Sequence, residues 1–230
     1  MLNRIRKLKV LKPLKIFYRF FRYGKCESFA KPKFFLNNSR NQETACFILA
    51  GYKSFTWEIV FKRIKAFCPK NIDICIVSSG IFSKELLEIA QKNSWSYLQT
   101  KKNNVCLALN TAIKNFSSAK NIFKLDEDIF VTEGFFENLS KVHEKSKEKY
   151  FPCFTAPLIP INGFGYSKIL EKLNLIEEYK KHFEEPRVSA GSWMQIENNL
   201  EVAKFFWGKK NFVPQIDELN KRLRKMGGGI

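Results

Sequence analysis

Residues 121–131 read Asn-Ile-Phe-Lys-Leu-Asp-Glu-Asp-Ile-Phe-Val, so three consecutive acids interrupt an apolar run. Side chains of an extended strand alternate between its faces. This alternation predicts Asp126 and Asp128 on one face, with Cα atoms roughly 6.5–7 Å apart, and Glu127 on the other. Magnesium is usually held by one or two carboxylates plus the phosphates of a substrate. The stretch therefore suits a metal–diphosphate site, although the motif alone is also typical of a strand that ends in a solvated acidic turn.

Short apolar runs alternate with amphipathic segments before this stretch. Strands are predicted at residues 45–50, 72–77 and 95–98, and helices at 55–67, at 84–90 after an N-cap at Ser83, and at 104–116. Such alternation predicts an α/β fold with a mostly parallel, mixed sheet flanked by helices. Ligands bind such sheets at the carboxyl ends of the strands, where Asp126, Asp128, Gly51 and Ser78 are expected.

The second half of the chain has a weaker pattern. A helix is predicted at residues 133–142, and an aromatic region rich in Pro and Gly follows at 151–166. Helical patterns return at residues 168–183 and 216–225. Irregular loops of this composition often build binding sites.

Charge is distributed unevenly along the 230 residues. Residues 1–36 contain 11 Lys and Arg and one acid, so they carry +10 of the net charge of +18. Residues 1–25 interleave basic with aromatic and aliphatic side chains, which predicts contact with an anionic membrane surface. RNA binding, or a helix packed on the domain, are the alternatives for this arm. Residues 27–43 are expected to form a linker.

The six cysteines show no spacing typical of zinc ligands, and several lie in apolar runs, which indicates a reducing cytoplasmic setting. The chain contains no run of 18 apolar residues that would predict a membrane span. With 45% hydrophobic residues and 23 Phe, the chain can bury a full core. A single globular domain with an appendage is therefore expected.

Residues 44–140 resemble the nucleotide-sugar-binding half of glycosyltransferases of the A fold (GT-A), most closely the inverting family 2 enzymes. Ala50-Gly51-Tyr52-Lys53 stands where that family has a Pro-Thr-Tyr-Asn-like turn. Asn104 and Asn110 match two Asn positions of the helix before the acidic strand, and Asp126-Glu127-Asp128 matches the Asp-x-Asp motif.

The resemblance implies that Asp128 ligates a Mn²⁺ or Mg²⁺ ion bridging the donor diphosphate, and that Asp126 contacts the ribose or the metal. The residues implied in donor binding are Ala50, Gly51, Tyr52, Ser78, Asn110, Asp126 and Glu127. Two features depart from the family. Ser78-Ser79 replaces an acidic pair that often holds the nucleobase, which leaves the base open, and a Gly near the start of the helix at 104–116 is absent.

An inverting transfer needs a carboxylate that takes the proton of the acceptor hydroxyl. Glu184 and Glu185, which lie between an aromatic residue and Pro186, are the first candidates for this base, and Glu197 and Asp217 are alternatives. Each of these acids also fits an ordinary surface position. The two histidines, His143 and His182, lie in charged helical segments and are expected to be solvated.

The sequence therefore predicts a metal-dependent glycosyltransferase that moves a sugar from a nucleotide-diphosphate donor to a surface-glycan or lipid-linked acceptor. It is expected in the cytoplasm, on the inner face of the membrane. The predicted layout is an arm and linker at 1–36 and a transferase domain at 44–225, with a donor half at about 44–140 and an acceptor half at about 150–225.

Two other classes stay open. A basic RNA-binding or membrane-associated non-catalytic protein would account for the arm but leaves the acids unexplained, which argues against nucleic acid as the partner. A nucleotidyltransferase would use similar acids, but no Gly-rich phosphate loop containing Lys or Arg follows the first strand. Gly227-Gly228-Gly229 either caps the last helix or marks a truncated reading frame of a longer enzyme.

Overall fold

The fold is described from a computed structural model, which covers residues 31–149, 154–157, 163–183, 200–207 and 212–226. The chain forms two compact units. The first unit comprises residues 1–54 and 70–127, and the second comprises residues 55–69 and 128–230. The arm at residues 1–25 lies outside the described residues.

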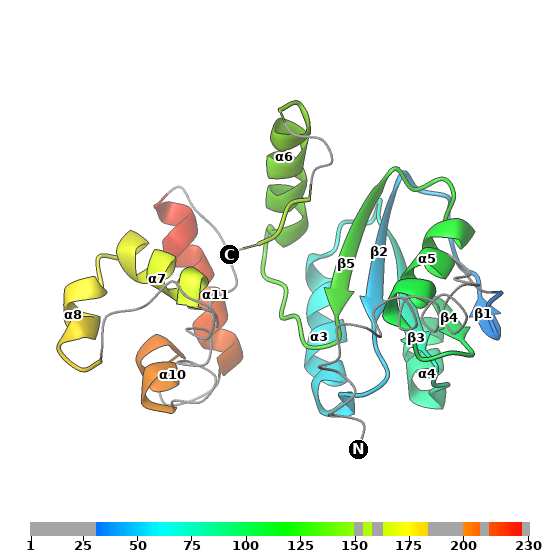
Figure 1. Cartoon of the computed structure of the whole chain (residues 1–230), viewed down its shortest axis with the longest axis horizontal. Helices are drawn as coiled ribbons and strands as arrows, with labels where there is room; N and C mark the ends of the chain where they lie inside the picture. The colour runs from blue at the N-terminus through cyan, green and yellow to red at the C-terminus, as the bar shows by residue number, and fades with distance from the viewer. Residues whose placement is uncertain (1–30, 150–153, 158–162, 184–199, 208–211, 227–230) are drawn as a thin grey trace, which may run out of the picture. The chain divides into compact units, whose positions relative to one another are not determined.

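The first unit is built on a five-stranded sheet in the order β1-β4-β3-β2-β5 (Figure 1). Its strands are β1 (Phe34–Leu36), β2 (Thr44–Leu49), β3 (Asp73–Ser79), β4 (Ser96–Thr100) and β5 (Asn121–Asp126). The four strands β4, β3, β2 and β5 run parallel to one another, whereas β1 is antiparallel to β4. The predicted α/β class with a mostly parallel, mixed sheet is confirmed.

Strand β1 lies inside the segment that the sequence predicts as a linker, so that prediction is wrong for residues 34–36. Aromatic packing explains the difference. The ring of Phe34 lies 5.3 Å from that of Phe82 and 5.8 Å from that of Tyr97, and Phe35 packs near Phe116. Three apolar residues are thus enough to add an edge strand because β4 offers both an open edge and an aromatic surface.

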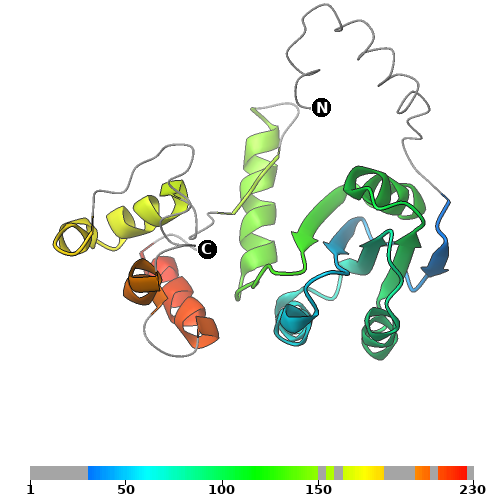
Figure 2. The ribbon, with the colours of Figure 1, turned by 60° about the horizontal axis from the view of Figure 1, so that its bottom comes forward.

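Helices α4 (Lys84–Asn93) and α5 (Val105–Asn115) cover opposite faces of this sheet (Figure 2). The core under α5 contains Ala45, Phe47, Cys75, Val77, Leu98, Ala108 and Ala112. On the other face, the hydroxyl of Tyr97 accepts a hydrogen bond from the N–H of Ser83, which caps α4 as predicted. Asn104 caps α5 in the same way.

A buried carboxylate fixes the amino end of β3. Asp73 is 2% exposed and accepts hydrogen bonds from Ser39 Oγ (2.7 Å), Gln42 N (3.1 Å) and both the backbone N (3.0 Å) and Nε (3.1 Å) of Arg40. Burial raises the pKa of Asp73, but these hydrogen bonds outweigh it and hold the pKa below its usual value. Asp73 therefore ties the segment before β2 to the sheet.

The second unit is helical in the residues described. Its helices are α3 (Ser54–Phe67), α6 (Phe135–Lys147), α7 (Gly163–Lys172), α8 (Ile176–Lys180), α10 (Leu200–Trp207) and α11 (Phe212–Lys225). One cluster packs Leu170 and Tyr179 against Val202, and another packs Ile169 against Ile216, Leu219 and Leu223. None of the helices in the described parts of the chain is both long and apolar enough to cross a membrane.

Several boundaries in the second unit differ from the prediction. Helix α6 runs five residues past the predicted end at Val142, because the charged stretch that follows pairs within the helix, as Lys147 does with Glu144. Helix α7 begins at Gly163, inside the region predicted to be irregular. Helix α10 was not predicted.

Candidate functional site

The strand order reverses at β2, since β3 lies on one side of it and β5 on the other. In open α/β sheets ligands bind at such a switch point, outside the carboxyl ends of the strands. The loop that follows β2 begins with Ala50-Gly51-Tyr52, and β5 ends at Asp126. Gly51 and Tyr52 in this loop, and Asp126 at the end of β5, therefore lie at the edge of the sheet where this fold class binds ligands.

The middle acid of the motif points into the protein. Glu127 is 6% exposed, and its carboxylate accepts hydrogen bonds from Gly51 N (2.9 Å) and from Tyr52 N (3.1 and 3.2 Å). The strand ends at Asp126, and Glu127 and Asp128 form a turn, so the prediction that strand alternation continues to Asp128 is wrong. Glu127 thus holds the loop that follows β2.

Tyr52 is fixed at both ends. Its backbone N–H donates to Glu127, and its hydroxyl donates to the carbonyl of Ser79 at 2.9 Å. The residue nevertheless stays 61% exposed. Gly51 has φ +154°, and a Cβ there would lie 2.7 Å from Ile81 Cγ2, so only glycine fits this turn. The result is an exposed aromatic ring in a fixed position at the strand ends.

The hydroxyls at the end of β3 connect the neighbouring loops. Ser78 is fully buried, and its Oγ donates to the carbonyl of Ala50 at 2.9 Å. Ser79 Oγ accepts a hydrogen bond of 2.8 Å from Asn104 N at the start of α5. The role of Ser78 in donor binding stays a prediction. Its observed contact is with the loop that carries Tyr52.

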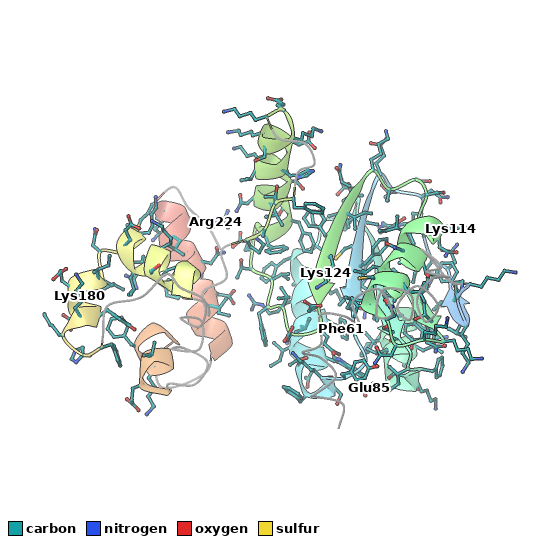
Figure 3. The ribbon with its side chains drawn as sticks, in the orientation of Figure 1. Phe61, Glu85, Lys114, Lys124, Lys180 and Arg224 are labelled. Atoms are coloured by element: carbon teal, nitrogen blue, oxygen red, sulfur yellow. The ribbon has the colours of Figure 1, made fainter. Side chains whose placement is uncertain are left out.

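Asp126 is the last residue of β5 and pairs in register with Leu49, so it lies on the α5 side of the sheet. Its side chain is half-exposed, and Nζ of Lys124 lies 2.6 Å from its Oδ2. Lys124 lies on the same strand (Figure 3). Asp128 is half-buried in the turn that begins the second unit, and Asn110 is exposed on α5. Two of the predicted ligands are thus carboxylates two residues apart in the chain.

A hard divalent ion bound by Asp126 and Asp128 stays a prediction. Asp126 and Asp128 offer carboxylate oxygens, which Mg²⁺ and Mn²⁺ prefer. In the part of the chain that the structure describes, no group of three or more His, Cys, Asp or Glu could enclose a metal. Two carboxylates suit a metal that completes its coordination with phosphate oxygens and water.

The first candidates for the general base, Glu184 and Glu185, lie outside the described residues, and so does Glu197. Asp217, the remaining candidate, lies on α11 and binds the guanidinium of Arg63 at 3.0 and 2.5 Å. In the same unit, His143 is half-buried and its Nδ1 lies 3.1 Å from a threonine hydroxyl. The prediction that this ring is solvated therefore holds only in part.

Arg63 was not predicted as important. Its side chain is 8% exposed on α3, where its Nε donates to the carbonyl of Val131 at 2.7 Å and its guanidinium lies 5.2 Å from the ring centre of Phe67. The sequence does contain a signal, because Arg63 falls on the apolar face of α3 between Val60 and Phe67. A cation on such a face indicates a buried partner.

A scan against protein-family models found no match to the chain, and a search of curated proteins found no significant match. What the site can do therefore follows from its own groups. The first unit presents a fixed aromatic ring, a loop held by a buried carboxylate, and a half-exposed acid at the end of the adjacent strand.

Proposed function

We propose that the chain is a metal-dependent glycosyltransferase of the GT-A fold, which moves a sugar from a nucleotide-diphosphate donor to a glycan or lipid-linked acceptor. The observation that carries this proposal is the ring of Tyr52, fixed and exposed at the switch point beside the strand that ends in Asp126. A flat apolar surface next to acids matches a ligand that has a planar base at one end and a metal-bound diphosphate at the other.

Each residue then has a defined role. The ring of Tyr52 stacks on the nucleobase, Asp126 binds the ribose or the metal, and Asp128 binds the metal. A Mn²⁺ or Mg²⁺ ion held by these acids would supply positive charge to stabilise the departing diphosphate. Glu184 or Glu185 would take the proton of the acceptor hydroxyl. Asp217 is a poor candidate for this base because it already binds Arg63.

The proposal includes a cytoplasmic location at the membrane surface. Residues 1–25 would bind anionic headgroups, with each basic side chain contributing on the order of 1 kcal/mol. Deletion of residues 1–25 should abolish co-sedimentation of the chain with anionic liposomes. Retained sedimentation would reject the arm as the anchor.

Calorimetric titration of the full chain with nucleoside diphosphates and nucleotide sugars, with and without Mn²⁺, tests the donor site. Asp128→Ala should abolish the metal-dependent part of the binding, and unchanged binding would reject the assignment. Tyr52→Ala should weaken binding by about tenfold to a hundredfold, since base–aromatic stacking contributes about 1–3 kcal/mol. Tyr52→Phe is the matched control because it keeps the ring and loses only the hydroxyl.

The same titrations distinguish the other function classes. A nucleotidyltransferase would bind a nucleoside triphosphate more tightly than any nucleotide sugar and would release pyrophosphate. An RNA-binding protein would bind single-stranded RNA in a salt-sensitive way that Asp128→Ala leaves intact. Either result would replace the proposal.

A further inference from the structure

The carboxylate of Glu127 occupies a position that α/β nucleotide-binding folds usually leave to a ligand. In those folds the backbone N–H groups that follow the first parallel strand at the switch point hold a phosphate. Here the N–H groups of Gly51 and Tyr52 in that position donate to the two oxygens of Glu127. The anion that these N–H groups bind is therefore part of the chain itself.

We propose that Glu127 is a built-in anion that fills the phosphate-binding position of the loop that follows β2 and thereby positions the ring of Tyr52. A ligand phosphate is then excluded from this loop, and the proposed function requires a metal ion to hold it beside Asp126. The role of Glu127 in the loop rests on its hydrogen bonds alone. The consequence for the nucleotide rests on the proposed function.

The chemistry of the contact favours a glutamate. Oε2 accepts from both N–H groups and Oε1 accepts from Tyr52 N, and hydrogen bonds to a charged acceptor are stronger than those to a neutral one. Glutamine would turn an NH₂ group toward a backbone N–H, and aspartate is one methylene too short. Asp73, the other buried carboxylate among the described residues of this unit, likewise accepts from backbone N–H groups.

Selective labelling makes the loop visible in the full chain. With ¹³C-carbonyl glycine and ¹⁵N-tyrosine, a carbonyl-edited NMR spectrum shows only tyrosines that follow a glycine, which are Tyr52 and Tyr166. The Tyr166 amide belongs to α7 and reports whether the second unit stays folded. Glu85→Ala is the control substitution because Glu85 is exposed in the first turn of α4 (Figure 3).

Glu127→Ala should shift the Tyr52 signal and speed exchange of its amide by about tenfold or more, the effect of losing a hydrogen bond to a charged acceptor. Acetate should restore the signal by filling the vacated space, whereas chloride at the same ionic strength should not. Inorganic phosphate without metal should move the Tyr52 signal in Glu127→Ala but not in the wild-type chain. Tyr166 and the Glu85→Ala variant should show none of these changes.

The proposal is overturned if acetate fails to restore the Tyr52 signal while the Tyr166 signal stays native. If Glu127→Ala loses both the Tyr52 and the Tyr166 signal, the chain is unfolded and the test is repeated with Glu127→Gln. A native Tyr52 signal in Glu127→Gln overturns the proposal. A loop that behaves as expected, together with no response of wild-type Tyr52 to any nucleoside diphosphate with Mg²⁺, would reject the proposed function and leave the role of Glu127 intact.

Discussion

The ion pair between Arg63 and Asp217 gives the sharpest stability prediction. Asp217→Asn keeps the shape of the side chain and removes its charge, so the buried guanidinium of Arg63 loses its anionic partner. Arg63 keeps its hydrogen bond to the carbonyl of Val131 and its contact with Phe67. The variant should therefore stay folded but unfold more easily.

The exposure of the two side chains sets the magnitude. Breaking a buried pair by removing one partner costs about 3–5 kcal/mol. Arg63 is 8% exposed, but Asp217 is 36% exposed, so water already screens part of the interaction. We therefore expect a loss of about 1–3 kcal/mol. For a chain of this size this lowers the melting temperature by roughly 2–4 °C per kcal/mol.

Scanning calorimetry of the full chain measures this shift. Glu218→Gln is the matched control, because Glu218 is the exposed neighbour on the same helix, and surface changes usually stay within about 0.5 kcal/mol. Arg63→Met and the double variant complete a cycle whose coupling energy should equal about 1–3 kcal/mol. If Asp217→Asn melts like Glu218→Gln, or if the cycle shows no coupling, the reasoning is refuted.

Three further predictions concern the first unit. Because the folded-state pKa of Asp73 is lowered, its contribution to stability is present above the unfolded-state pKa and is lost as the pH falls through the folded-state value. Urea titrations measure the free energy of unfolding of the wild type and of Asp73→Asn. The difference between these two free energies should shrink from neutral to acidic pH, and a constant difference would contradict this prediction. Gly80→Ala should lower the free energy of unfolding in urea by about 1–3 kcal/mol. The reason is that φ of Gly80 is +81° and the new Cβ would lie 2.6 Å from Asn103 N. A variant as stable as the wild type would contradict this close approach. A thiol reagent should modify the exposed Cys106 in the native protein but should reach Cys75 only on unfolding, since Cys75 is buried and burial raises the pKa of its thiol. Equal modification rates for the two thiols would contradict the burial of Cys75.

Local patterns predicted the elements with strong periodicity. The sequence placed β2, α4 and α5 within about three residues of their observed bounds, because the apolar runs and the cap at Ser83 are local signals. The position of Asp126 at a strand end follows from the same patterns. Strand β1 escaped prediction because three apolar residues between polar neighbours show no period, and only its packing on β4 makes it a strand.

The contacts that organise the candidate site could not be predicted from local pattern. Glu127 binds a loop 76 residues away in sequence, and Arg63 binds Asp217 at a separation of 154 residues. Glu127 follows the last residue of β5, and nothing in the sequence identifies the loop that its carboxylate binds. A single sequence therefore indicates which residues are polar and where strands end, whereas the pairing of buried charges depends on tertiary structure.

The direction of β1 has a consequence for how an acceptor would be found. Because β1 is antiparallel to β4, its first residues meet the carboxyl end of β4, where Lys33 N donates to Gln99 O at 2.8 Å. The chain thus enters the sheet at the edge that carries Tyr52, and three strand spacings, about 14 Å, separate β1 from β2. If residues 1–25 hold the lipid surface as proposed, encounters between the chain and a lipid-linked acceptor become a two-dimensional search at high local concentration.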